Sequence, residues 1–242
     1  MTQDAPSAAG ARLRAGLAAL GPYFAVDVHH PGSPVRPPWQ PLGELTSSPG
    51  ALAHRIGEVR ERLAAAAGCP VAAVEFRVAA SIAQLGLCAR LLSPALGAAA
   101  TGRPLPVDAE QARWVPALGG PFRLSLAEDA ITAEAGTDET AALLAGPITQ
   151  IVRSVEAMAV SPRVLWGNVA SAVNGAATMI AAARPDLAGP AVEAAAALLA
   201  DPALTGTYQG RPGAAFRRRN CCLIYRLSPE RPAYCGDCVL GR

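Results

Sequence analysis

Four of the six cysteines in this chain of 242 residues lie within its last 22 residues. They form an adjacent pair, a gap of twelve residues, and a second pair with two residues between its members: Cys221, Cys222, Cys235 and Cys238. The two-residue gap lets both sulfurs of that pair turn toward one metal ion. Neighbouring side chains of an extended strand point apart, so the adjacent pair needs a bent backbone or two separate ions. We therefore expect the C-terminal segment to fold so that its thiols meet.

Three kinds of chemistry can join these cysteines. Disulfides need an oxidising compartment, and we expect no signal peptide because Gly21 and Pro22 interrupt the apolar run that follows Arg12 and Arg14. A structural zinc site usually has two C-x2-C pairs, which the adjacent pair does not match. A [2Fe–2S] cluster spreads four thiolates over two irons and accepts irregular spacing. The spacing favours the iron–sulfur cluster and leaves the other two chemistries open.

The composition excludes other classes of protein. The chain has no lysine, and its 21 arginines nearly balance 19 acidic residues, for a net charge of +2. A balance this close to neutral argues against a nucleic-acid partner. Hydrophobic residues, mostly alanine, make up 51% of the chain, which is typical of a folded protein rather than a disordered one.

Apolar residues recur at helical spacing along most of the chain. A proline after a serine marks the expected start of two helices, at Ser48-Pro49 and Ser161-Pro162. We expect helices over residues 8–20, 49–67, 71–92, 95–100, 147–158, 162–183 and 190–200, with a further short helix capped by Thr137-Asp138. Residues 122–126 alternate between apolar and polar and predict a strand, whose partner is expected in residues 113–118. The expected fold is α+β, mostly α-helical, with a small sheet and a cysteine-ligated C-terminal segment.

A change in composition divides the chain. Residues 103–121 are rich in proline and glycine, and residues 29–50 are predicted to form a loop. We divide the chain into a mainly helical part (1–120), a strand-plus-helix part (121–215) and the iron–sulfur segment (216–242). These parts are also compatible with a single compact domain.

The longest run without charge, Val164–Ala183, is long enough to span a bilayer. It contains Asn168, Ser171 and Asn174, and its glycines and alanines make it only weakly apolar. We therefore interpret it as a helix inside a cytoplasmic protein with no stable membrane insertion.

Several stretches resemble a known family. They are Arg-Arg-Arg-Asn-Cys-Cys-Leu-Ile-Tyr-Arg at 217–226, Cys-Gly-Asp-Cys at 235–238, Leu-Trp-Gly-Asn-Val-Ala-Ser at 165–171, and the helix at 77–94. Together they resemble the FhuF-type ferric siderophore reductases. The usual gap between the cysteine pairs in that family is ten residues, and we expect a turn at Ser228–Pro232 to absorb the two extra residues here. The resemblance implies a [2Fe–2S] cluster on Cys221, Cys222, Cys235 and Cys238 and the one-electron reduction of a ferric siderophore in the cytoplasm.

The implied reaction is chemically reasonable. The hard oxygen ligands of a hydroxamate-type siderophore hold Fe(III) far more tightly than Fe(II), so a low-potential electron donor releases the iron. All-thiolate clusters of the plant type have potentials of about −400 mV. The chain has neither a G-x-G-x-x-G fingerprint nor a P-loop. We therefore expect no bound NAD(P)H or flavin, and we expect electrons to come from a separate ferredoxin-like donor.

Two further groups of residues are candidates for roles at this site. Four arginines flank the cysteines and are expected either to offset the cluster charge or to dock a partner; the alternative is a solvated face. These are Arg217, Arg218, Arg219 and Arg226. Asn168, Ser171 and Asn174 form a polar stripe that is expected to line a siderophore cleft beside Trp166; the alternative is a stripe that faces water or caps a loop.

Two other functions remain open on the sequence alone. One is a non-catalytic iron–sulfur electron carrier or redox sensor. The other is an interaction domain stapled by zinc. Cys69 and Cys88 are expected to be small packed residues rather than ligands.

Overall fold

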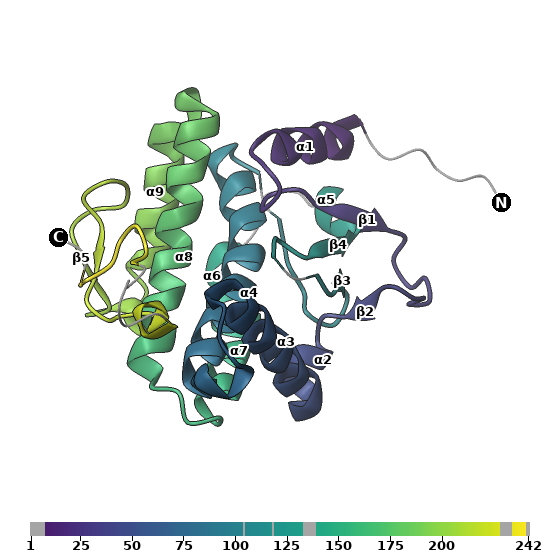
Figure 1. Cartoon of the computed structure of the whole chain (residues 1–242). Helices are drawn as coiled ribbons and strands as arrows, with labels where there is room; N and C mark the ends of the chain where they lie inside the picture. The colour runs from purple at the N-terminus through teal and green to yellow at the C-terminus, as the bar shows by residue number, and fades with distance from the viewer. Residues whose placement is uncertain (1–7, 104, 118, 133–138, 228–233, 241–242) are drawn as a thin grey trace.

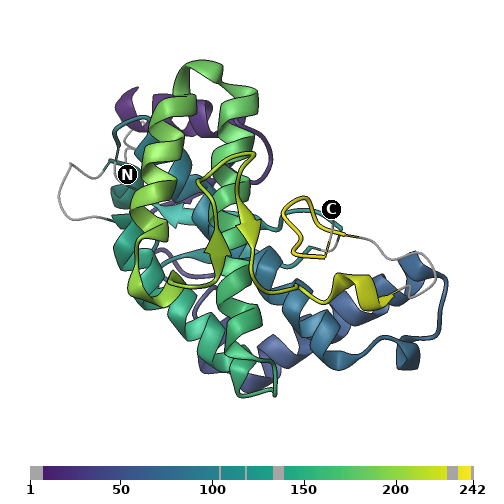
Figure 2. The same ribbon diagram turned by 90° about the vertical axis from the view of Figure 1, so that its left-hand side faces the viewer.

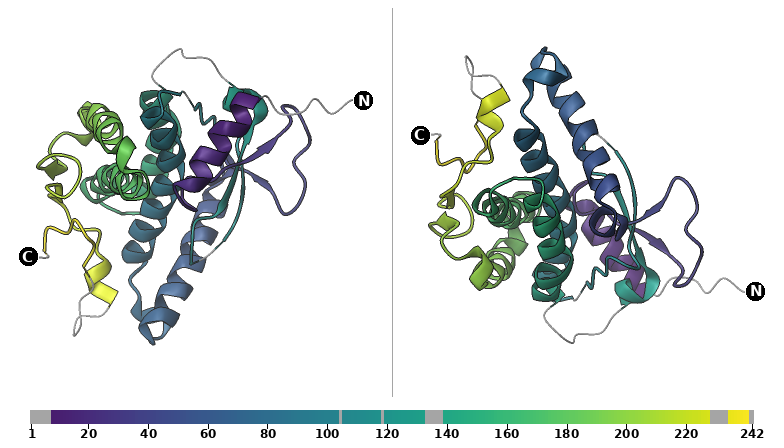
Figure 3. Two further views of the ribbon diagram at one scale, coloured as in Figure 1. Left: turned by 90° about the horizontal axis from the view of Figure 1, so that it is seen from above. Right: turned by 90° about the horizontal axis from the view of Figure 1, so that it is seen from below.

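Two long helices, α4 (Phe76–Ala100) and α8 (Pro162–Ala183), pack against each other at the centre of the molecule (Figure 1). The computed structural model describes residues 8–103, 105–117, 119–132, 139–227 and 234–240. Seen from above and below, the elements form successive layers: a small sheet, the helices around α4, the pair α8 and α9 (Ala188–Leu199), and the C-terminal segment (Figure 3). The expected class, a mostly helical α+β fold with a small sheet, is confirmed.

Helix α4 runs through Pro94, so the predicted helix end at Ser93-Pro94 is wrong. An internal proline removes one backbone hydrogen bond and costs roughly 3 kcal/mol. Leu91, Leu92 and Leu96 are almost fully buried on both sides of the proline, and each such burial contributes about 1.5–3 kcal/mol. Packing therefore outweighs the local cost, and the short helix expected at 95–100 is the last part of α4.

Helices α4 and α8 are both apolar enough, by length and composition, to cross a bilayer. However, 78% and 61% of their most apolar windows are buried inside the molecule. Their apolar side chains thus pack in the core of the molecule, as those of the central helices of a soluble protein do.

The other helices lie around this pair. The expected helices at the N-terminus, after Ser48 and near residue 190 are confirmed as α1 (Ala8–Ala19), α3 (Pro49–Ala67) and α9. Helix α3 ends at Gly68, whose φ of 65° suits glycine at a helix end. Pro147 lies within a π-helical turn rather than at a helix start, and α7 follows it. The remaining bounds are α2 (Glu44–Ser47), α5 (Glu128–Thr132), α6 (Glu139–Leu143) and α7 (Thr149–Glu156).

The larger sheet has the order β1-β4-β3-β2. Its strands are β1 (Asp27–His29), β2 (Gln40–Pro41), β3 (Arg113–Val115) and β4 (Arg123–Ala127). The antiparallel pairing of β3 with β4, with Trp114 opposite Leu124, confirms the predicted strand and its partner. Strands β1 and β2 were not predicted, because two or three residues are too short to show an alternating pattern.

The expected boundary at residue 120 falls between β3 and β4, which are neighbours in this sheet. A hydrophobic core of buried residues extends from Leu13 on α1 to Phe216 in the C-terminal part. Residues on both sides of the boundary therefore share one core. The expected cap at Thr137-Asp138 and the expected turn at Ser228–Pro232 lie outside the described residues.

A short hairpin of β5 (Tyr208–Gln209) and β6 (Arg217–Arg218) lies against α8 (Figure 2). The rings of Tyr208 and Phe216 stack with centroids 5.2 Å apart and fasten the hairpin to the core. Because β6 ends three residues before Cys221, the hairpin determines where the cysteine segment begins.

Candidate metal centre

The four C-terminal cysteines lie on two pieces of chain. Cys221 and Cys222 follow β6, and Cys235 and Cys238 belong to residues 234–240, which return toward β6. The backbone N–H of Arg218 donates to the carbonyl of Asp237 at 3.0 Å and joins the two pieces. All four are free thiols; Cys222 and Cys238 are buried, and Cys221 and Cys235 are half-buried. The fold thus brings together cysteines that are twelve residues apart in sequence.

The sulfur atoms of Cys222 and Cys235 are 3.8 Å apart. This distance is too long for a disulfide, whose S–S bond is about 2.05 Å. It matches the separation of two thiolates that share a tetrahedral metal ion, which is about 3.8 Å for metal–sulfur bonds of about 2.3 Å. One cysteine from each pair therefore already has the spacing that a shared ion requires.

Backbone N–H groups point at the other two sulfurs. The N–H of Leu223 donates to Cys221 Sγ and that of Leu240 donates to Cys238 Sγ, both at 3.3 Å. Leu223 has a φ of 72°, a left-handed conformation that is unusual for a residue with a branched side chain. This bend aims its N–H back at Cys221. Such N–H···S bonds stabilise thiolates and are one of the factors that set iron–sulfur potentials.

The thiols influence one another electrostatically. A hydrogen bond with Cys235 lowers the pKa of Cys222 to about 6 and raises the pKa of Cys235. Burial raises the pKa of Cys221, and the neighbouring Cys222 and Cys238 raise it further. The pair Cys222–Cys235 thus loses one proton readily and holds the second one.

Among the described residues, no three His, Cys, Asp or Glu side chains converge as ligands of a single ion would. The thiols instead form one close pair and two further sulfurs with backbone donors. A group with two metal atoms takes its four protein ligands in two pairs. The four free thiols, the 3.8 Å pair and the N–H donors fit such a group in their chemistry.

Arg218, three residues before Cys221, is fully buried. Its Nε donates to the carbonyl of Asn220 at 3.0 Å and its Nη2 to Asn168 Oδ1 at 2.6 Å. Its Nη1 is buried and has no hydrogen-bond partner. After the larger effects of burial and of the Cys222–Cys235 bond, the charge of Arg218 lowers the pKa of Cys221, Cys222 and Cys235.

Asn168 connects this arginine to the central helices. Its Nδ2 lies within hydrogen-bond distance of the carbonyl and hydroxyl oxygens of Ser81, both at 3.0 Å, and of Gln84 Oε1 at 2.9 Å. Ser81 Oγ in turn donates to the carbonyl of Cys222 at 2.9 Å. A fully buried polar network therefore runs from α4 through α8 to the cysteine segment.

The other residues of the predicted cleft have different surroundings. Ser171 Oγ donates to Asp237 Oδ2 at 2.6 Å, and Asn174 Oδ1 accepts from the N–H of Gly213 at 2.7 Å. Together with Asn168, these side chains hold the C-terminal segment against α8 rather than lining an open cleft. Trp166 is half-buried and packs against the core.

The four arginines near the cysteines also separate into different roles. Arg217 and Arg219 are exposed, whereas Arg218 is buried. Arg226 forms an ion pair with Glu75 at 2.8 Å, which ties the segment after Cys222 to the start of α4. Only Arg218 has both the burial and the unused donor expected of a group that offsets buried negative charge.

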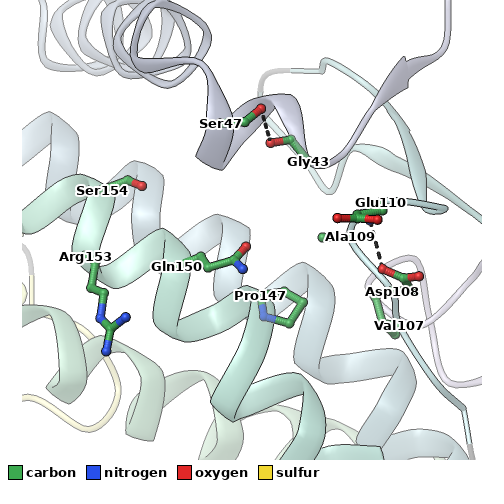
Figure 4. A pocket seen from close by; sticks show the side chains of 10 residues that line it. All are labelled: Gly43, Ser47, Val107, Asp108, Ala109, Glu110, Pro147, Gln150, Arg153 and Ser154. Atoms are coloured by element: carbon green, nitrogen blue, oxygen red, sulfur yellow. Dashed lines mark hydrogen bonds between the residues drawn. The ribbon is translucent and has the colours of Figure 1, made fainter.

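The largest of four pockets among the described residues, of about 610 Å³, lies elsewhere in the molecule (Figure 4). Asp108 and Glu110 form one wall and Gln150 and Arg153 of α7 the other. Neither this pocket nor three smaller ones is lined by a cysteine or by Trp166. The described pockets therefore do not provide a deep substrate cavity at the cysteines.

Sequence reasoning missed four residues of the site: Ser81, Gln84, Gly167 and Asp237. A Cβ on Gly167 would lie 3.3 Å from Arg218 Nη2 and 3.4 Å from Asn220 Cβ, so this glycine admits the arginine. The signal for Ser81 and Gln84 was present, since two polar residues at helical spacing interrupt an apolar helix. Their shared partner, Asn168, lies 87 and 84 residues further along the chain, and the sequence does not show this contact.

Comparison with models of known protein families, with curated proteins and with solved structures finds no match for this chain.

Proposed function

We propose that this protein is a cytoplasmic ferric siderophore reductase that holds a [2Fe–2S] cluster on Cys221, Cys222, Cys235 and Cys238. The observation that carries the proposal is a C-terminal segment with four free thiols in which one cysteine of each pair meets the other, the sulfurs of Cys222 and Cys235 being 3.8 Å apart. A disulfide-linked segment would have no use for a buried, partly unpaired guanidinium beside the thiols. An anionic metal–thiolate group would offset that charge.

When bound, such a cluster supplies single electrons at low potential, which is the chemistry needed to convert siderophore-bound Fe(III) to Fe(II). The chain's own residues provide the setting. The N–H groups of Leu223 and Leu240 donate to the sulfurs, and Ser81 fixes the carbonyl of Cys222. The electron itself comes from a separate ferredoxin-like donor.

The surface around the cysteines supports approach by a bulky substrate. Tyr234, Val239 and Leu240 are large apolar residues with 45–50% of their surface exposed, beside Cys235 and Cys238 in sequence. Exposed apolar groups next to a redox centre suit contact with an iron chelate that stays at the surface. This arrangement needs no deep pocket, in keeping with the pockets described above.

The first experiment is iron and acid-labile sulfide analysis of anaerobically purified protein, with its visible spectrum before and after dithionite. Two irons and two sulfides per chain, with absorption that dithionite bleaches, are expected for the intact protein. Cys235→Ser is expected to lose both. The matched control, Cys69→Ser, changes a half-buried cysteine outside the segment and should retain them. Colourless protein with stoichiometric zinc would contradict the proposal.

A second candidate is a non-catalytic iron–sulfur electron carrier, which the absence of cysteines from the four pockets favours. Stopped-flow mixing of the dithionite-reduced protein with ferric hydroxamate siderophores separates the two. A reductase is reoxidised by a siderophore faster than by ferric citrate. Equal or slower reoxidation would favour the carrier.

A further inference from the structure

Arg218 presents an unusual electrostatic arrangement. Its side chain is fully buried, and no carboxylate lies within ion-pair distance of it among the described residues. A buried charge is costly unless it is paired and fully hydrogen-bonded. The neutral partners of Nε and Nη2 meet only part of this requirement.

The unused donor, Nη1, identifies what is missing. It is buried and has no hydrogen-bond partner, although the other two nitrogens of the same guanidinium are bonded. Three of the four C-terminal thiols, those of Cys221, Cys222 and Cys235, lie within range of its charge. These thiols bind metal as thiolates, so they can become anions close enough to Arg218 for its charge to act on them.

The guanidinium is held in place by the protein. Asn168 presents its carbonyl oxygen to Nη2 because its Nδ2 is directed at Ser81 and Gln84 on α4. Gly167 leaves space for the arginine that a Cβ would reduce. The charge is thus placed before any metal group binds, so binding requires little reorganisation.

We infer that Arg218 is the residue that tunes the reduction potential of the metal centre, with Asn168 as its positioning residue. The inference rests on the proposed function. A [2Fe–2S] group with four thiolates carries two net negative charges when oxidised and three when reduced. A fixed positive charge beside it stabilises the reduced form more than the oxidised form. Arg218 therefore raises the potential and makes the centre easier to reduce by its donor.

The test compares Arg218→Met, Arg218→Lys and the wild type. Methionine retains an unbranched side chain of similar length without charge or donors. Lysine retains the charge without the planar fork. The matched controls are Arg217→Gln and Arg219→Gln, which remove exposed charges from the adjacent positions. The readouts are iron and sulfide per chain and the midpoint potential from an anaerobic titration with redox dyes.

Arg218→Met is expected to lower the equilibrium constant for one-electron reduction at least tenfold, a fall of 59 mV or more. Arg218→Lys should lie between this variant and the wild type, and the two controls should change the constant less than threefold. The inference is overturned if iron-loaded Arg218→Met has an equilibrium constant for reduction within threefold of the wild-type value. It is also overturned if Arg219→Gln lowers that constant as much as Arg218→Met does.

The outcome separates the inference from the proposed function. Wild-type protein without iron and sulfide overturns both. Wild-type protein with the cluster, together with an unchanged potential in Arg218→Met, overturns the inference alone. If Arg218→Met does not fold, Asn168→Ala decides, because it releases the guanidinium from its fixed position; an unchanged potential in that variant overturns the inference.

Discussion

Arg90 and Arg218 are the two largest fully buried side chains of the described residues, and their surroundings differ. Arg90, on α4, donates to the carbonyl oxygens of Phe122, Tyr23 and Ala25. Every nitrogen of its guanidinium has a partner, and the group joins α4 to the segments before β1 and β4. Arg218 has two neutral partners, a free Nη1 and thiols within range of its charge.

The hydrogen-bond partners of a buried arginine distinguish a structural role from a role at a charged site. Burial lowers the pKa of Arg90 to about 10, so it remains charged at neutral pH while backbone carbonyls satisfy it. It acts as a cross-link. Arg218 retains a donor and a charge that no group of the described protein satisfies. A structural role accounts for the first arginine, and the proposed anionic metal group would account for the second.

The largest effect is expected from removal of the proposed metal group. Chelation under reducing conditions should lower amide hydrogen-exchange protection of residues 217–227 by about a hundredfold or more, because metal binding and local folding are coupled. Protection of residues 23–25 and 122–127, around Arg90, should remain unchanged. The measurement is exchange mass spectrometry of the metal-loaded and metal-free protein. Equal loss in both regions would break the comparison.

The next largest effect concerns Arg90 itself. Arg90→Met leaves one buried and two part-buried carbonyl groups without donors, and we expect the free energy of unfolding to fall by roughly 3–5 kcal/mol. Urea denaturation measures this loss. Arg123→Met is the control, since Arg123 is exposed and pairs with Asp27 at the surface, and its loss of stability should be far smaller than that of Arg90→Met. Iron per folded chain should not change in either variant.

Asn168→Ala tests the residue that orients Arg218 rather than the arginine itself. It removes the partner of Arg218 Nη2 and the donor to Ser81 and Gln84, and we expect a loss of about 2 kcal/mol. It should also lower the midpoint potential, since Arg218 loses its fixed orientation. Asn174→Ala removes only the bond to Gly213, so a loss of about 1 kcal/mol and an unchanged potential are expected. Identical potentials in the two variants would contradict the positioning role.

Local signals in the sequence were sufficient for most of the helices. Helix α8 begins at the predicted proline, and α3 has the predicted bounds and is followed by Gly68, because caps and turns depend on nearby residues. The sequence did not show which face of α4 is most buried. Ile82 and Leu85 follow the helical spacing of apolar residues but are half-buried, whereas Ser81 and Gln84 are fully buried. A buried polar residue needs a partner, and here the partner is Asn168 on α8.

The candidate site was predictable to a similar degree. The cysteine spacing identified the thiols, since metal ligands leave a local pattern. The sequence alone did not separate Arg218 from Arg217 and Arg219, because strand alternation in β6 and the space at Gly167 decide which arginine is buried. The polar stripe of α8 was correctly identified as a stripe, but the segment it holds lies about 40–70 residues further along the chain, as in the bonds of Asn174 and Ser171.

The smallest expected effect is at Ser171. Its hydroxyl donates to Asp237 at 2.6 Å, and Asp237 also accepts the backbone N–H of Arg218 at its carbonyl. Ser171→Ala should lower the free energy of unfolding by about 1 kcal/mol, because the carboxylate is half-buried and water replaces part of the bond. A double-mutant cycle with Asp237→Asn, followed by urea denaturation, isolates the coupling, expected at about 0.5–1 kcal/mol. The equilibrium constant for one-electron reduction should stay within threefold of the wild-type value, since neither change moves the Arg218 guanidinium. A coupling near zero would show that the return of residues 234–240 toward β6 depends on the Arg218 N–H bond and the metal ligands instead.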